Sequence, residues 1–257
     1  MAGMAATQPK ISMYIDLNCD MGEGMPNDAE IMPYISSANI ACGYHAGDNG
    51  TMEQTITLAL KHQVAIGAHP GFRDKENFGR TEQRLSDAEV YDLIATQLYT
   101  LDKVCLSLDA TIRHVKPHGA LYNMAARDQH LSTIIAQAIR DTNPALCLFG
   151  LSNSWLIKAA AAMGLKTASE VFADRTYQED GSLTPRSQPN ALIDNEADAL
   201  QQVLQMVTKQ EVTTVNGKTV PIRAETICLH GDGAHAVAFA KAVHKTLEEH
   251  HLTIQHT

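Results

Sequence analysis

Short apolar runs rich in β-branched residues alternate with segments of helical periodicity along nearly the whole chain. The apolar runs lie near residues 13–17, 38–42, 64–68, 111–115, 146–150, 167–173 and 226–230. Such alternation with short links is typical of parallel strands joined by crossover helices. We therefore expect an α/β fold, and 257 residues is a typical length for a β/α barrel.

A doubly wound open sheet is the alternative, but neither a Gly-x-Gly-x-x-Gly motif after the first strand nor a Walker A motif is present. Residues 1–12 are predicted to form a flexible extension, and residues 13–257 a single domain. Helices are predicted near residues 28–36, 51–61, 86–108, 128–141, 152–163, 194–209 and 233–250. Ser86 with Glu89 forms a capping box, and Asp28 and Ser152 are candidate N-caps.

Two segments interrupt the alternation. Residues 174–193 form a polar stretch whose length is typical of a lid or binding loop. Residues 212–222 are predicted to form a hairpin that turns at Asn216-Gly217.

Charge and cysteine content narrow the class of protein. The formal charge is −9 without a basic run, which disfavours a nucleic-acid groove or binding to an anionic membrane surface. The N-terminus lacks the pattern of a secretory signal, and the five cysteines show no Cys-x-x-Cys motif. Reduced thiols and a cytoplasmic location are expected. Cys42 and Cys228 are interpreted as core residues.

Ionisable side chains follow the predicted strands, and active sites of parallel barrels gather at the carboxyl ends of their strands. The sequence thus predicts one cavity lined by Asp16, His45, His69, Lys116, Asp174 and His230. Asp16, Asn18 and Asp20 are spaced by two, so in extended chain they share one face, and Asn18 is a candidate substrate ligand. Asp16 lies in an apolar run, either as a catalytic base or as an acceptor of backbone hydrogen bonds.

His45 and His69 follow the second and third strands. With Asp20 they are candidate ligands for a divalent metal, because two imidazoles and one carboxylate suit zinc-like ions. The alternative is that both histidines bind substrate or satisfy hydrogen bonds within the fold. Lys116 is a candidate to hold a carboxylate or phosphate, and His118 to carry a proton; the alternative is a lysine that extends to solvent.

The last strand ends at His230, a candidate catalytic residue, and Asp232 is a candidate substrate ligand where free N–H groups attract anions. An ordinary N-cap role for Asp232 is the alternative. Asp174 and Arg175 open the long loop, and both are candidate substrate ligands, since an arginine can clamp a substrate carboxylate.

A series of motifs covers residues 14 to about 250 in order: DLNCDMGEG, SSANIACGYHAGD, VAIGAHPGF, ENFGR, RHVKPHGALYN, EVFADRTYQEDGSLTPRSQ and CLHGDGAHA. Together they resemble the LamB/YcsF family. The resemblance implies a seven-stranded parallel β/α barrel related to carbohydrate deacetylases. It also implies a role in an ATP-dependent 5-oxoprolinase, which opens the lactam of 5-oxo-L-proline to L-glutamate while ATP is hydrolysed.

The same resemblance implies two partners, 5-oxoprolinase subunits B and C. ATP is the implied cofactor, and the lack of a Walker A motif favours a nucleotide held partly or wholly by the partners. Two alternatives remain open: a metal-dependent carbohydrate deacetylase or amidohydrolase that does not use ATP, and a non-catalytic subunit of the complex.

Overall fold

A closed barrel of seven parallel strands forms the centre of the computed structural model, which describes residues 14–231 and 235–257. The barrel strands are β1 (Tyr14–Met21), β2 (Ser37–Ala41), β3 (Ala65–His69), β4 (Ile112–Val115), β5 (Cys147–Leu151), β6 (Lys166–Phe172) and β9 (Thr226–Leu229). Neighbours pair in chain order, and β9 pairs with both β6 and β1, which closes the ring. The barrel prediction is confirmed over the open sheet.

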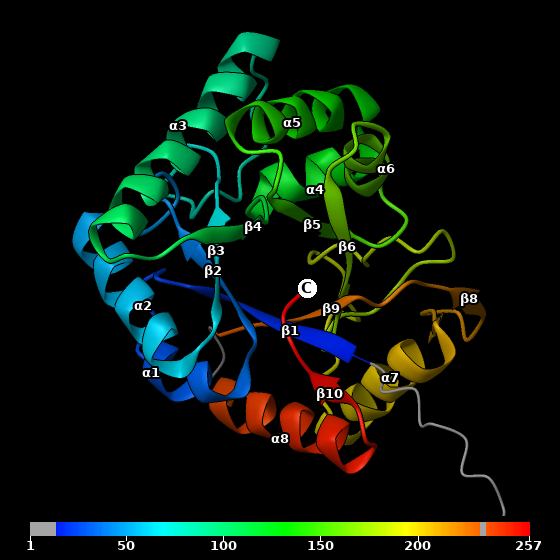
Figure 1. The fold of residues 1–257 in the computed structure, drawn as a ribbon. Helices are drawn as coiled ribbons and strands as arrows, with labels where there is room; N and C mark the ends of the chain where they lie inside the picture. Colours follow the sequence, from blue (N-terminus) through cyan, green and yellow to red (C-terminus); the bar gives the residue numbers. More distant parts are fainter. Residues whose placement is uncertain (1–13, 232–234) are drawn as a thin grey trace, which may run out of the picture.

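The helices lie around the outside of the strands (Figure 1). They are α1 (Asp28–Ile31), the 3₁₀ helix η1 (Met32–Tyr34), α2 (Asn49–His62), α3 (Asp87–Ser107), α4 (Gly119–Arg127), α5 (Gln129–Thr142), α6 (Trp155–Ala162), α7 (Glu196–Lys209) and α8 (Ala236–Glu249). None of them, within the described ranges, has the length and apolar character needed to cross a membrane. β7 (Glu211–Thr213) and β8 (Thr219–Pro221) form the predicted hairpin, and β10 (Thr253–Ile254) pairs with the start of β1.

The residues at which the helices begin confirm one of the three predicted N-caps and contradict the other two. The Ser86–Glu89 capping box is confirmed. The other two predicted caps are wrong: Asn27 precedes α1, and the carboxylate of Asp28 instead accepts a hydrogen bond from the Gly22 amide at 2.7 Å. Ser154, not Ser152, caps α6. The extension predicted for residues 1–12 lies outside the described residues.

Helix α4 was not predicted. It begins at Gly119, whose φ of +55° is in the left-handed region that favours glycine. A Pro-His-Gly sequence is typical of a turn, so no signal for a helix start is visible there. The chain turns sharply from β4 into α4, which brings Lys116 and His118 to the end of the barrel.

The barrel interior is unusually polar. Branched aliphatic side chains usually fill such a barrel. Here the buried polar side chains of the barrel strands are Asp16, Asn18, Ser37, Asn39, His69, His114, Ser169, Glu170 and Thr226. Buried polar groups need hydrogen-bond partners, and most of these side chains bond to one another, as Asn18 does to Asn39, Glu170 and Thr226.

Gly67 makes room for part of this interior. A Cβ atom at Gly67 would lie 2.0 Å from His114 Nε2. The His114 ring stacks on Phe149 with centroids 4.2 Å apart, and its Nε2 lies 2.8 Å from Asn39 Oδ1. The ring therefore has no direction in which to move away from an added methyl group.

Gly67→Ala is accordingly expected to destabilise the fold by about 1–3 kcal/mol or more, the usual cost of overpacking a filled interior. Gly50→Ala is the matched control, because the nearest atom to its Cβ would be Asp48 Oδ1 at 3.5 Å, an ordinary contact. Urea denaturation of both variants measures the difference. Equal stabilities would contradict the proposed crowding of His114.

Candidate active site

A cavity of about 890 Å³ opens at the carboxyl end of the barrel, where active sites of this architecture lie. Ends of the strands and the segment 174–193 contribute to its wall. The ionisable residues that line it near the strand ends are Asp20, Glu23, His69, Lys116, His118, Arg175 and His230.

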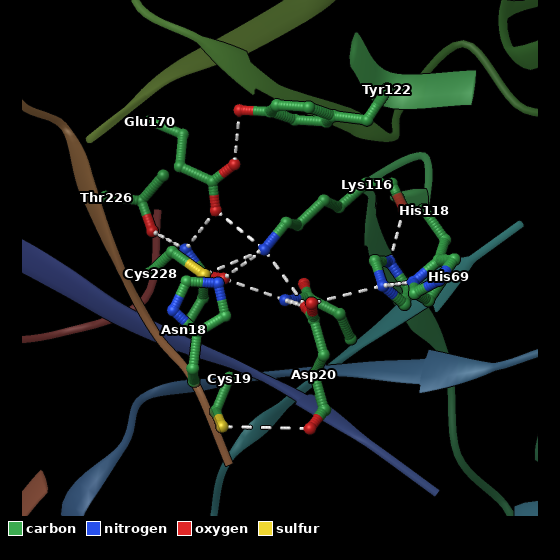
Figure 2. A network of polar contacts seen from close by, with 12 residues as sticks. Asn18, Cys19, Asp20, His69, Lys116, His118, Tyr122, Glu170, Thr226 and Cys228 are labelled. Atoms are coloured by element: carbon green, nitrogen blue, oxygen red, sulfur yellow. Dashed lines mark hydrogen bonds and ion pairs between the residues drawn. The ribbon is translucent and has the colours of Figure 1, made fainter. Parts of the chain in front are cut away.

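Lys116 connects the cavity to the barrel interior. Figure 2 shows its Nζ between two carboxylates, 2.8 Å from Glu170 Oε1 and 3.0 Å from Asp20 Oδ1. Nζ also donates to Asn18 Oδ1, and it lies 3.1 Å from Cys228 Sγ. Burial alone would lower the pKa of Lys116, but the surrounding negative charge outweighs burial and holds this pKa well above its usual range. The side chain is therefore a permanent ammonium ion.

The two carboxylates differ in exposure. The Glu170 side chain is fully buried and accepts hydrogen bonds from Asn18 Nδ2 at 3.0 Å and from the Tyr122 hydroxyl at 2.6 Å. The Asp20 side chain is 21% exposed and lines the cavity. Burial would raise the pKa of Asp20, but His69 and Lys116 hold it well below its usual range. Asp20 thus presents a carboxylate to the cavity.

Lys116→Met is expected to cost about 3–5 kcal/mol of unfolding free energy, because it leaves two partly or fully buried carboxylates without their counter-ion. Adding Glu170→Gln to that variant removes one of the stranded charges. The loss of unfolding free energy in the double variant should therefore be smaller, by more than about 1 kcal/mol, than the sum of the losses in the two single variants. Chemical denaturation of the four proteins of this cycle measures the coupling, and strictly additive effects would argue against the shared ammonium.

A cluster of three histidines and a glutamate lies beside this ion pair. His118 Nδ1 lies 2.9 Å from His69 Nε2 and 3.2 Å from Glu23 Oε1, which is also 3.0 Å from His45 Nε2. Burial would raise the pKa of Glu23, but hydrogen bonds from His118 and His45 lower it to about 2. Burial lowers the pKa of His45 to about 4, so its imidazole is neutral near pH 7. Among the residues that the structure describes, these four side chains form a group that could hold a metal ion.

His230 lines the cavity and contacts the side chains of Asp174 and Arg186. Its Nδ1 lies 2.8 Å from Asp174 Oδ1, and its Nε2 lies 2.9 Å from an Arg186 nitrogen. Because a guanidinium can only donate, Nε2 accepts and Nδ1 carries the hydrogen. Arg175, predicted to hold substrate, lines the cavity, but its Nε and one terminal nitrogen donate to the carbonyls of Ala191 and Thr184. Arg175 therefore fastens the long loop to the end of β6.

Other predicted residues lie behind the cavity wall. Asp16 lies in the first half of β1, where it accepts hydrogen bonds from Ser36, Ser37 and Thr226, and burial raises its pKa. It does not line the cavity, because β1 continues to Met21, four residues beyond the predicted strand end, and brings Asp20 to the rim instead.

Asn18 lies one layer below the rim, in contact with Lys116. His45 and Asp174 support cavity-lining side chains from behind, through Glu23 and His230 respectively. Asp232 lies outside the described residues. His118, the predicted proton carrier, has both ring nitrogens engaged: Nδ1 toward His69 and Nε2 toward the Phe78 carbonyl.

Sequence reasoning missed Glu23, Glu170, Asn39, His114 and Tyr122. Glu170 carried a usable signal, since a glutamate in the apolar run of β6 is as conspicuous as Asp16 in β1. Glu23 follows the first strand between glycines, which resembles an ordinary turn. Cys228, interpreted as a core residue, is fully buried, and burial raises the pKa of its thiol well above its usual range.

His114 predicts a pH dependence of stability. Burial lowers its pKa to about 3, whereas an unfolded histidine titrates near 6.5. Between these values the unfolded chain binds a proton that the folded chain does not, so this residue stabilises the fold above pH 6.5 and progressively less below it. When the pH falls from 7.5 to 5.5, the unfolding free energy of the His114→Asn variant should decrease by about 1.4 kcal/mol less than that of the unmodified chain. Urea denaturation at both pH values checks this, and an equal loss would contradict it.

The fold and site define a β/α-barrel protein whose cavity combines a lysine, carboxylates and imidazoles. Residues 15–257 match the LamB/YcsF family. The A subunit of the 5-oxoprolinase of Brevibacillus brevis is 53% identical over 245 residues, which cover 93% of this chain and 96% of that protein. The chain therefore belongs to the LamB/YcsF family.

Solved structures agree with this placement. The lactam utilization protein from Thermus thermophilus superposes with a TM-score of 0.89 at 38% identity, covering 95% of this chain and 99% of that one. The peptidoglycan deacetylase PdaC from Bacillus subtilis has a TM-score of 0.51 at 12% identity, over 97% of this chain and 89% of that one. The second likeness shows that the barrel fold is shared.

Proposed function

We propose that this protein is the A subunit of an ATP-dependent 5-oxoprolinase, which opens the lactam of 5-oxo-L-proline to L-glutamate. The observation that carries the proposal is the Lys116–Asp20 pair at the cavity wall, in a chain that is 53% identical to the A subunit of a 5-oxoprolinase. An ammonium ion and an adjacent carboxylate supply the two functions that the reaction needs, charge stabilisation and orientation of water.

The chemistry of the substrate explains why ATP is needed. A five-membered lactam is a stable amide, and phosphorylation of its oxygen would make the ring carbon electrophilic and create a leaving group. Negative charge then develops beside the ring. Lys116 is a buried cation at the cavity wall that stays charged, so it is the side chain we assign to stabilise that charge, while Asp20 orients the attacking water.

Basic side chains also surround the cavity in this acidic protein. Beyond Lys116, those that line it are Arg80, Arg127, Lys158, Arg175 and Arg186, which outnumber the lining carboxylates Asp20, Glu23, Glu82 and Asp180. This local excess attracts anions such as the substrate carboxylate and phosphate groups. Because the chain has no Walker A motif, we assign ATP binding at least partly to the partner subunits B and C. We place the complex in the cytoplasm, in keeping with five cysteines that are all unpaired.

Asp20→Asn tests the assignment with a change of only one atom. Removing the carboxylate charge while keeping the shape should lower turnover by ~100–1,000-fold, the usual loss for one electrostatic group at a reacting centre. Lys116 keeps its pair with Glu170, so the fold should persist. The assay is glutamate release from 5-oxo-L-proline by the chain with subunits B and C and ATP, and thermal melting verifies folding.

Asp87→Asn is the matched control, because the Asp87 side chain is 66% exposed at the start of α3. Wild-type turnover by Asp20→Asn would remove Asp20 from the mechanism. ATP-independent glutamate release by the isolated chain would overturn the proposal and favour the second candidate, a metal-dependent amidohydrolase or deacetylase. The cluster of three histidines and Glu23 is the observation in favour of that candidate.

A further inference from the structure

Four side chains from four separate segments converge beside Lys116. Glu23 follows β1, His45 follows β2, His69 ends β3 and His118 follows β4. Each contributes one ligand atom, and these atoms all lie within 4.8 Å of one another. The three histidines are buried.

Hydrogen bonds to backbone carbonyls fix the protonation of two of these rings. His69 Nδ1 lies 2.6 Å from the carbonyl oxygen of Lys116, and His118 Nε2 lies 2.8 Å from that of Phe78. A carbonyl can only accept, so each of these nitrogens carries the ring hydrogen. In the neutral form of each ring, the opposite nitrogen, His69 Nε2 or His118 Nδ1, carries no hydrogen.

The two unprotonated nitrogens lie only 2.9 Å apart. Two lone pairs that face each other at this distance repel, unless a positive charge lies between or beside them. The Glu23 carboxylate, 3.2 Å from His118 Nδ1, adds a negative charge to the same point. The arrangement calls for a cation, either an extra proton or a metal ion.

Distances favour the metal. Four ligand atoms bound tetrahedrally at zinc distances lie about 3.4 Å from one another. The separations here are 2.9 Å for His118–His69, 3.0 Å for His45–Glu23, 3.2 Å for His118–Glu23 and 3.7 Å for His69–Glu23. These four separations bracket the tetrahedral value, and the other two, from His45 to His69 and to His118, are within 4.8 Å. Histidines that bind metals usually donate their other N–H to a carbonyl or carboxylate, as His69 and His118 do here.

We propose that Glu23, His45, His69 and His118 form a binding site for a divalent transition metal of the zinc type. The site differs from the predicted trio in Asp20, whose Oδ1 accepts from Lys116 and Asn39 and whose Oδ2 lies 3.3 Å from His69 Nε2, outside the group of four ligand atoms. Glu23 and His118 take its place. The inference concerns the wall of the same cavity but does not depend on the lactam reaction, because metal binding is measured without substrate, ATP or partners.

The experiment uses the full chain, stripped with a chelator and then titrated with Zn²⁺ against a chromogenic competitor. About one Zn²⁺ per chain should bind. His69→Gln and His118→Asn should each weaken binding by more than the 10–100-fold typical of losing an outer-shell partner. His130→Asn is the control, since its side chain is 73% exposed and pairs with Asp87 on the surface. Circular dichroism verifies that each variant is folded.

Substitution with Co²⁺ provides a readout that needs no variant. Four-coordinate Co²⁺ with imidazole ligands gives intense visible absorption bands, and excess Zn²⁺ should abolish them. Failure of the unmodified chain to bind Zn²⁺ and to give these bands would overturn the proposal and leave a shared proton between His69 and His118. Wild-type affinity in folded His69→Gln and His118→Asn would overturn the ligand assignment.

Discussion

The buried ammonium of Lys116 is the interaction on which the rest of the site depends. It neutralises Glu170 inside the barrel and Asp20 at the rim, and its own backbone carbonyl accepts the hydrogen that fixes the ring of His69. Residue 116 therefore balances the charge of the interior through its side chain and orients His69 through its backbone. Isolated charges in such an interior would be prohibitively costly, so each group depends on the others.

A polar barrel interior gives the cavity wall its rigidity. Asn39 donates to Asn18 and Asp20 and faces His114, so the layers of the interior are joined by directional bonds in addition to packing. Gly67 leaves the space in which the His114 ring reaches Asn39. Side chains held in this way are fixed before a ligand binds, which is what preorganised electrostatic groups require.

The barrel was predictable from the sequence because strand and helix periodicities are local properties. The positions of His69, Lys116 and His118 at strand ends followed from the same rule. The partners of these residues did not, because the contact between Lys116 and Glu170 depends on strand register across the barrel, and a one-residue shift turns a side chain to the other face. Asp16 shows this limit: the strand continued past its predicted end, and the rim position went to Asp20.

The pairing of β1 with β9 has a consequence for folding. Thr226 donates a hydrogen bond to Asp16, which is 210 residues away in the sequence, and Lys116 contacts Cys228, which is 112 residues away. Such long-range contacts form late, because the entropy of closing a long loop must be paid before they contribute. Until β9 has been synthesised and inserted, Lys116 lacks part of its surroundings. A nascent or truncated chain thus has an incomplete site, and assembly of the site coincides with closure of the barrel.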